Sequence, residues 1–281
     1  MEGLQIAAPL VLMCLAAWPA QSSGGDGDGS PKVRASLVAD VAEARAGAPF
    51  HLGVRFEIDD GWHIYWRYPG GAGLATAVDF ELPEGVVAGP LQWPVPITFT
   101  QSGDIPGYGY VGSVVLASEV SAAATFDRSR PSTVRVVASW LACKEVCVLG
   151  SAELEGSLLA LPEDPAFREW ENLLPRASEA EEPPFTFTAD GGLESGRVTQ
   201  WLRWRETPRS VEWFPDPPEA IEVGDIRVQT RGGLTRIDAA LRRRKGVGGP
   251  ADDLPSLVVV TGADGVRTGW KLNVHLENQP S

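Results

Sequence analysis

The chain has 281 residues, a formal net charge of -13 at pH 7, 43% hydrophobic residues and three cysteines. This length suits one large domain or two modest domains that each bury a core. The acidic balance argues against nucleic acid as a partner, because phosphate binding needs a basic surface. Three cysteines are too few for a scaffold built on disulfides, so any chemistry they carry is local.

The N-terminal segment predicts an exported protein. Residues Ile6 to Ala17 form an apolar run, and a tract rich in Gly, Ser and Asp follows it. The run has the length of a signal peptide and is shorter than the about 20 apolar residues that a membrane-spanning helix needs. We expect a signal peptide over residues 1–22, a flexible N-terminus over 23–31 and a periplasmic mature protein. A buried N-terminal helix is the alternative.

Residues 32–161 predict an antiparallel β-sandwich. Leu52, Val54, Phe56 and Ile58 alternate with more polar residues, which is the pattern of a half-buried strand. Gly and Pro residues separate this run from the others, and short strands at such spacing are typical of a sandwich. The further strand-like runs cover residues 62–68, 77–82, 112–120, 133–141 and 152–159.

The segment Pro162 to Arg176 predicts a helix, because Asp164 can cap it and Pro165 suits its first turn. An acidic stretch that ends in prolines continues to residue 184 and is typical of a linker. A second β-rich region is expected over residues 185–281. The sequence therefore predicts an all-β protein: a β-sandwich, a short helix with a linker over 162–184, and a second β-sandwich-like domain.

Cys143 and Cys147 follow the strand-like run 133–141, and two cysteines at this spacing can meet across a tight turn. A disulfide that closes so short a loop contributes only about 2 kcal/mol in the chain-entropy model, so it is an inefficient staple. Short disulfides tend to be readily reduced, which suits thiol–disulfide exchange. Three interpretations stay open: a redox pair, a structural disulfide and a metal site. For the metal site, these residues allow copper bound by the two cysteines and His63.

A dense set of aromatic residues precedes the cysteine pair. A sandwich core can absorb most of them. The alternative is that some cover the cysteine pair and restrict access until a partner docks. The set comprises Trp62, Tyr65, Trp66, Tyr68 and Trp93.

Residues 32–161 resemble the N-terminal domain of the DsbD and ScsB protein-disulfide reductases. Four sequence motifs carry the resemblance, and they occur in the same order. They are WHIYWRYPG (62–70) with Gly73-Leu74, LPEG (82–85) with GPLQWP (89–94), YGYVG (108–112) and WLACKEVC (140–147).

The resemblance implies an immunoglobulin-like sandwich with Cys143 and Cys147 as the redox pair, and it leaves open which cysteine attacks first. It implies that electrons pass from a membrane-embedded thiol reductase through this pair to periplasmic disulfide proteins, without a cofactor. It also associates the chain with cytochrome complex assembly and copper tolerance. Full-length relatives add a multi-span domain and a thioredoxin-like domain, which these residues do not contain. We therefore expect a separate membrane reductase as partner. The alternative is a non-catalytic periplasmic binding module with a structural disulfide, or a copper-handling protein.

Overall fold

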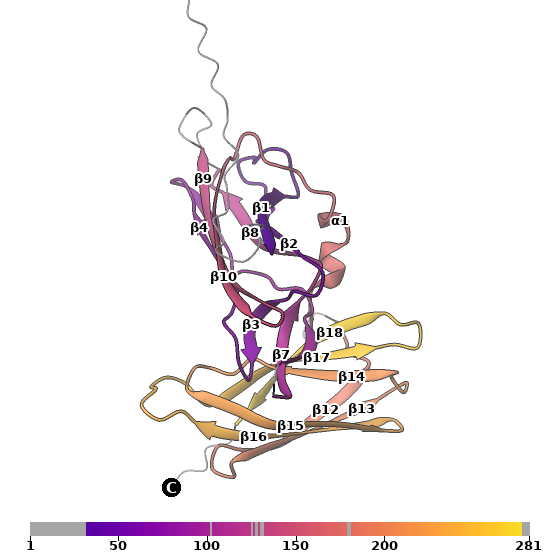
Figure 1. The fold of residues 1–281 in the computed structure, drawn as a ribbon. Helices are drawn as coiled ribbons and strands as arrows, with labels where there is room; N and C mark the ends of the chain where they lie inside the picture. The colour runs from indigo at the N-terminus through magenta and orange to yellow at the C-terminus, as the bar shows by residue number, and fades with distance from the viewer. Residues whose placement is uncertain are drawn as a thin grey trace, which may run out of the picture.

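The structure is a computed structural model that describes residues 32–101, 103–124, 126, 129, 132–178 and 181–276. The predicted signal peptide over 1–22 and the predicted flexible N-terminus over 23–31 lie outside these residues. Strands dominate the described part and the helix is short, which confirms the predicted all-β fold (Figure 1). No helix in the described ranges is long and apolar enough to cross a membrane.

Strands β1 to β10 form the first sandwich. One sheet has the order β1-β2-β8-β5, the opposite sheet has the order β10-β9-β4, and a small third sheet has the order β3-β7-β6 (Figure 1). The strands are β1 (Val33–Ala39), β2 (Phe50–Ile58), β3 (Ile64–Gly70), β4 (Ala77–Glu81), β5 (Val86–Ala88), β6 (Ile97–Gln101), β7 (Ile105–Tyr110), β8 (Ser113–Ala122), β9 (Thr133–Cys143) and β10 (Cys147–Ser157).

Alternating apolar side chains build the core of this sandwich. In β2, Leu52, Val54 and Phe56 are fully buried, as the alternation in the sequence predicts. Phe56 packs edge-on against Trp140 of β9, with ring centroids 5.4 Å apart, and so joins the two main sheets. Burying a large apolar side chain stabilises the fold by roughly 1.5–3 kcal/mol, so these contacts hold the sheets together.

The helix after the first sandwich is shorter than the sequence predicts. The prediction of a helix over Pro162 to Arg176 is wrong in extent, because α1 covers only Phe167–Trp170 and continues as the 3-10 helix η1 (Glu171–Leu173). Trp170 is buried and donates its indole N–H to the carbonyl oxygen of Val115 at 2.9 Å. Trp170 therefore anchors the short helix to the first sandwich.

Local chemistry sets both ends of this helix. The Asp164 carboxylate accepts the backbone N–H of Ala166 at 2.8 Å, which holds the preceding residues in a turn. At the other end, Leu174 has extended angles with ψ of 145°. Because a proline disfavours helical angles in the residue before it, Pro175 ends the helix there.

Strands β11 to β18 form the second sandwich. Its sheets have the orders β11-β18-β17-β14 and β12-β13-β16-β15, with one apolar core between them. The strands are β11 (Arg176–Ala177), β12 (Phe185–Gly192), β13 (Arg197–Trp204), β14 (Ser210–Pro215), β15 (Ile221–Arg231), β16 (Leu234–Arg243), β17 (Asp253–Thr261) and β18 (Arg267–His275).

The two sandwiches meet through a shared apolar contact. Along β14, Trp213 belongs to the core of the second sandwich, whereas the next residue, Phe214, belongs to the core of the first. Phe214 is fully buried, and its ring centroid lies 5.1 Å from that of Tyr108 and 6.2 Å from that of Trp66. Because these two rings come from β7 and β3, the second sandwich is anchored on the small third sheet.

Ion pairs surround this apolar contact. A guanidinium nitrogen of Arg67, in β3, lies 2.8 Å from a carboxylate oxygen of Asp216. Arg267, in β18, reaches the carboxylate of Glu212 at 2.6 Å and the carbonyl oxygen of Pro96 at 3.0 Å, so it bridges the two sandwiches. Partly exposed pairs contribute at most about 1 kcal/mol each, so they orient the sandwiches more than they hold them.

Replacing Phe214 by alanine should destabilise the whole chain, because it leaves a cavity between the sandwiches. Truncation of a buried phenylalanine lowers the free energy of unfolding by about 3–5 kcal/mol. Phe214→Leu is the matched control and should lose much less, since leucine refills part of the volume. Urea denaturation followed by tryptophan fluorescence measures both variants. An unchanged midpoint for Phe214→Ala would contradict a shared core.

Candidate functional site

The two candidate cysteines lie opposite each other at the closed end of the β9–β10 hairpin. β9 ends at Cys143, β10 begins at Cys147, and the two residues are register partners joined by a disulfide. Their Cα atoms are 4.1 Å apart. In the turn between them, the N–H of Lys144 donates to the carbonyl oxygen of Val146 at 3.0 Å. The structure thus brings the two predicted site residues together.

The geometry gives no support to the metal-site interpretation. The two sulfurs are bonded to each other. Within the ranges that the structure describes, no group of three or more His, Cys, Asp or Glu side chains is placed to hold a metal ion. The choice between a redox and a structural disulfide then depends on what surrounds each sulfur.

The two cysteines differ in their exposure to solvent. Cys143 is only 3% exposed, whereas Cys147 is an exposed residue. Thiol–disulfide exchange requires a thiolate to reach one sulfur of the disulfide, and access decides which one. Of the two sulfurs, that of Cys147 is therefore the one that an incoming thiolate can reach.

His63, directly before β3, lies opposite Cys143 and adds a third residue to the two paired cysteines. The backbones of His63 and Cys143 exchange two hydrogen bonds, each 3.0 Å long. Directly opposed residues place their side chains on the same face of a sheet, so His63, Cys143 and Cys147 form one row. Burial lowers the pKa of His63 below its usual 6.5, and the imidazole is therefore neutral at pH 7.

Tyr65 supplies a hydroxyl to the buried sulfur. The side chain is fully buried, and its oxygen lies 3.4 Å from the sulfur of Cys143 and 2.8 Å from the amide oxygen of Gln101. Burial raises the pKa of Tyr65, so the hydroxyl stays protonated and donates. Gly73 makes room for the ring, because a Cβ there would lie 2.3 Å from a ring carbon of Tyr65.

The hydroxyl of Tyr65 has two acceptors but one proton. In the disulfide form the shorter contact is to Gln101, a neutral amide. When Cys143 leaves as a thiolate, its sulfur becomes a charged acceptor, and hydrogen bonds to charged groups are roughly twice as strong as neutral ones. The O–H is therefore placed to turn toward the sulfur as negative charge develops there.

Phe99, in β6, covers the row of side chains. Its ring centroid lies 3.9 Å from that of His63 and 5.7 Å from that of Tyr65. Gly107 on β7 makes this possible, because a Cβ there would lie 2.3 Å from the ring of Phe99. No pattern in the sequence indicates Phe99 or Gln101 as site residues. Their strand was not among the expected ones, and no local motif indicates which segment β6 meets.

The aromatic set noted in the sequence divides between two places. Tyr65 lies at the cysteine pair, as the covering interpretation requires of at least one member. The other four lie in the first core or pack against it, as the core interpretation predicts: Trp62, Trp66, Tyr68 and Trp93.

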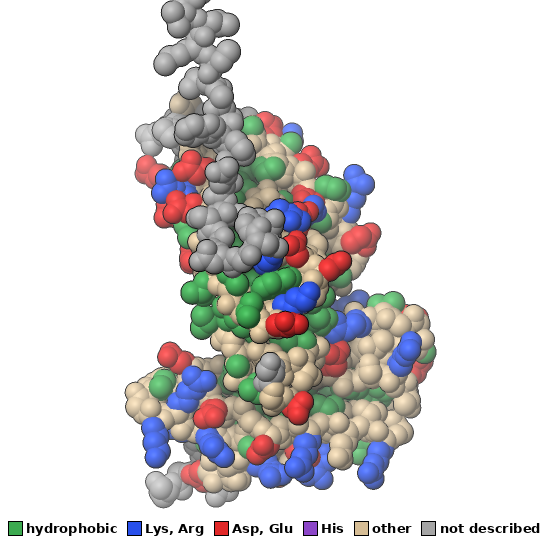
Figure 2. All heavy atoms as spheres, viewed as in Figure 1, with side chains coloured by type: hydrophobic (Ala, Val, Ile, Leu, Met, Phe, Trp, Pro, Cys, Tyr) green, Lys and Arg blue, Asp and Glu red, His purple; other side chains and the backbone are tan. Residues whose placement is uncertain are grey.

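Exposed apolar side chains lie around the cysteine hairpin. Val146 is 63% exposed and Leu149 is 67% exposed, one on each side of Cys147 along the chain. Leu74, which follows the glycine against Tyr65, is 56% exposed. Figure 2 shows hydrophobic side chains gathered near the lower end of β10. Clustered exposed apolar side chains mark interaction sites more often than isolated ones do.

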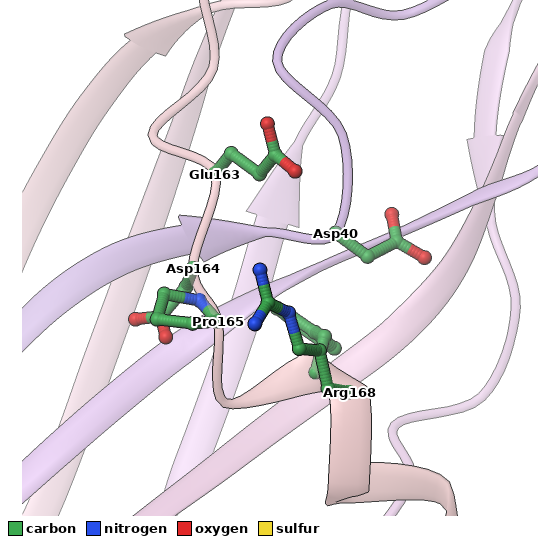
Figure 3. A pocket seen from close by; sticks show the side chains of 6 residues that line it. Asp40, Glu163, Asp164, Pro165 and Arg168 are labelled. Atoms are coloured by element: carbon green, nitrogen blue, oxygen red, sulfur yellow. The ribbon is translucent and has the colours of Figure 1, made fainter.

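A separate pocket of about 490 Å³ lies at the start of α1. Figure 3 shows the guanidinium of Arg168 between Asp164 and Asp40. The two aspartates already have partners, since Asp40 pairs with His51 and Asp164 with Arg55. Among the described residues, the lining contains no cysteine, serine or histidine, so the disulfide hairpin stays the candidate site. The lining residues are Asp40, Glu163, Asp164, Pro165, Phe167 and Arg168.

Tyr65→Phe should slow reduction of the disulfide, because the departing Cys143 thiolate loses its O–H donor. A hydrogen bond to a charged group is worth about 1.5–3 kcal/mol, so the rate constant should fall by about tenfold or more. Stopped-flow reduction by dithiothreitol measures it. Gln101→Leu is the matched control: it releases the Tyr65 hydroxyl from its competing acceptor, and the rate should not fall. Equal rates for wild type and Tyr65→Phe would rule out this role.

The burial of His63 should make stability fall on the acid side of pH 6.5. Its pKa is lowered in the folded state, so the unfolded chain binds more protons, and the free energy of unfolding decreases as the pH drops through this range. His63→Gln should flatten that part of the dependence. Urea midpoints measured on both sides of pH 6.5 test it. Parallel pH profiles for wild type and His63→Gln would show that His63 contributes nothing.

Comparison with known proteins agrees with these features. The family model described as "Thiol:disulfide interchange protein DsbD, N-terminal" matches residues 35–158. The N-terminal periplasmic domain of ScsB from Proteus mirabilis has a similar fold, with a TM-score of 0.66 and 17% sequence identity. That similarity covers 90% of this chain and 98% of the ScsB domain. A search among curated protein sequences finds no match.

Two further solved structures are only distantly similar. They are the MSCRAMM ACE of Enterococcus faecalis, with a TM-score of 0.21, and the collagen-binding domain of the surface protein RspB of Erysipelothrix rhusiopathiae, with 0.18. Both are 10% identical to this chain and cover 88% of it, with 97% and 96% of their own lengths.

The site and the family match coincide. The hairpin of Cys143 and Cys147, with its disulfide, lies inside the matched segment, and so do Tyr65 and Phe99. The likeness to the ScsB domain extends over both sandwiches and confirms the predicted fold. Residues 35–158 belong to the DsbD N-terminal family and form a thiol–disulfide exchange domain.

Proposed function

We propose that this chain is a periplasmic protein that relays electrons from a membrane-embedded thiol reductase to periplasmic disulfide proteins through Cys143 and Cys147. The difference in exposure carries the proposal, because one sulfur is accessible and the other is buried beside a hydroxyl donor. The periplasmic location rests on the predicted signal peptide and on the ScsB domain, which is periplasmic. Cytochrome complex assembly and copper tolerance stay predictions from the resemblance.

In the loading step, the chain accepts two electrons. A thiolate of the reductase attacks the sulfur of Cys147, the Cys143–Cys147 bond breaks, and Cys143 leaves as a thiolate beside the hydroxyl of Tyr65. The second thiolate of the reductase then attacks the reductase sulfur that is bonded to Cys147. This attack releases Cys147 as a thiolate and leaves the reductase oxidised.

In the delivery step the same chemistry runs toward the target. The Cys147 thiolate attacks the target disulfide, a mixed disulfide forms, and one target sulfur leaves as a thiolate. Cys143 then attacks the sulfur of Cys147, which restores the internal disulfide and releases the second target thiolate. The target gains the two electrons that the pair loses, and no cofactor takes part.

A non-catalytic module with a structural disulfide is the alternative. β9 and β10 are already joined by eleven register pairs, so a bond at their closed end constrains little that the hairpin does not already fix. In the chain-entropy model so short a loop contributes only about 2 kcal/mol. A structural role also gives no reason for one sulfur to be accessible. The relay is therefore the better proposal.

The two single cysteine variants should behave differently toward a protein that carries a disulfide. Cys143→Ser keeps the exposed thiol and removes the resolving one, so it should accumulate a mixed disulfide. Cys147→Ser keeps only the buried thiol and should accumulate about tenfold less, in line with the dependence of exchange on access. Non-reducing electrophoresis and mass spectrometry measure the adduct, and the double variant is the blank. Equal trapping by both variants would refute the assigned order of attack, and trapping by neither would refute the relay.

A further inference from the structure

β10 is an edge strand that begins at the exposed cysteine. Its sheet has the order β10-β9-β4, and β10 pairs with β9 alone (Figure 1). The pairing runs from Cys147 to Ser157 without a register shift. In the part of the chain that the structure describes, no other segment forms a backbone hydrogen bond with residues 148–156. Over residues 148–156, one side of this strand is therefore left unpaired by the described part of the chain.

The hydrogen bonds of Cys143 determine which backbone groups of β10 point outward. Cys143 uses both its N–H and its carbonyl oxygen on His63, so the pair with Cys147 is a non-hydrogen-bonded one. Its Cα distance of 4.1 Å agrees, since such pairs lie at about 4.5 Å and hydrogen-bonded pairs at about 5.5 Å. Because the two kinds alternate, the N–H and carbonyl groups of Cys147, Leu149 and Ser151 face the open edge.

The part of the edge next to Cys147 lacks the usual protection. Edge strands are normally short, bulged, charged or interrupted by proline, because an open edge invites pairing with another chain. Residues 148–152 (VLGSA) contain no charge and no proline, and charges return only at Glu153 and Glu155. The other edge strand of this length, β15, is interrupted by a bulge between Gly224 and Arg227. The lack of edge protection in this segment of β10 therefore needs a functional explanation.

An added strand would place a partner residue at bonding distance from the exposed sulfur. If a strand pairs antiparallel with β10, the residue opposite Cys147 forms a hydrogen-bonded pair with it at a Cα distance of about 5.5 Å. That value lies within the range of about 4.4–6.8 Å that disulfides span. The two side chains would also stand on the same face of the sheet. An added cysteine in this register therefore meets Cys147 without a change in either backbone.

We propose that the edge of β10 over residues 147–151 is a docking site for an extended segment of the exchange partner, which pairs antiparallel with the strand and carries its reactive cysteine opposite Cys147. The occupant is an uncharged or apolar strand, because the edge carries no charge there and the exposed side chain of Leu149 flanks the cysteine on the same face. Backbone hydrogen bonds supply the binding and tolerate different sequences, as strand addition does elsewhere. The proposal rests on the exchange function proposed for the cysteine pair.

The experiment uses the full chain with Cys143→Ser, whose Cys147 thiol is free, and two synthetic peptides. The first is acetyl-Thr-Val-Cys-Val-Thr-amide with its cysteine activated as a thionitrobenzoate disulfide. The second carries a methyl group on the cysteine backbone nitrogen, which removes the donor that would face Cys147. Thiol attack by Cys147 on either peptide forms the mixed disulfide and releases thionitrobenzoate, whose absorbance gives the rate. Activated glutathione is the probe that needs no docking.

The unmethylated peptide should react about tenfold faster than the methylated one, which is the factor that one hydrogen bond supplies. Adding Leu149→Pro, which removes an outward N–H that no bond within the chain uses, should abolish most of this difference. Glu155→Pro is the matched control: its N–H also faces the open edge but lies beyond the peptide, so the difference should persist. The rate with glutathione should be the same in all variants.

Hydrogen exchange of the trapped adduct provides a second measurement. In the free protein the amide protons of Val148 and Gly150 should already be protected, and those of Cys147 and Leu149 should exchange fast. In the peptide adduct the amide protons of Cys147 and Leu149 should become protected as well.

Equal rates for the two peptides, or no new protection in the adduct, would overturn the docking proposal. Protection of the same amides without peptide, together with a dimer in size-exclusion chromatography, would assign the edge to a second copy and overturn it too. Failure of Cys147 to react even with glutathione would instead refute the proposed exchange function.

Discussion

The alternation of side chains along β3 is the constraint on which the rest of the structure depends. Successive residues of a strand point to opposite faces. Here both faces are occupied, because Tyr65 contacts the sulfur of Cys143 and Trp66 packs against Phe214 of the second sandwich. A shift by one residue would exchange these environments and lose both contacts. The second sandwich therefore holds the strand that carries the hydroxyl, although its own residues lie on the other side of that strand.

This arrangement gives the buried sulfur a donor that is in place before any charge forms. A donor whose position is fixed by packing costs little reorganisation when negative charge develops. Tyr65 is confined by Gly73 below its ring and by Gln101 at its hydroxyl, and the ring of Phe99 lies beside it. In the proposed relay the exposed sulfur of Cys147 needs no such donor, because it is the one attacked. Burial and exposure thus assign different tasks to two chemically identical groups.

Local patterns in the sequence predicted much of the fold, and contacts between distant segments account for what they missed. The alternation of Leu52, Val54 and Phe56 depends on period alone, and the structure agrees with it. The helix is shorter than predicted, because the Asp164 carboxylate holds residues 164–166 in a turn and Pro175 keeps Leu174 extended. Gln101 and Phe99 reach the site through the pairing of β6 with β7, and Phe214 reaches the first core from another sandwich. No periodicity or motif within one segment predicts such contacts between segments that are distant in the sequence.

The position of the cysteine pair and the open edge of β10 follow from one geometric requirement. In an antiparallel pair of strands, the Cα atoms of directly opposed residues are closest at non-hydrogen-bonded positions, where a disulfide can join them. A cysteine at such a position directs its N–H and carbonyl oxygen away from its partner. For Cys143 these groups are taken up by His63 on the inner side. For Cys147, on the outer strand, they necessarily face solvent or a further strand. Placing a disulfide between a central and an edge strand therefore gives the accessible sulfur its own backbone recognition groups, whereas a pair between two central strands would give neither accessibility nor recognition.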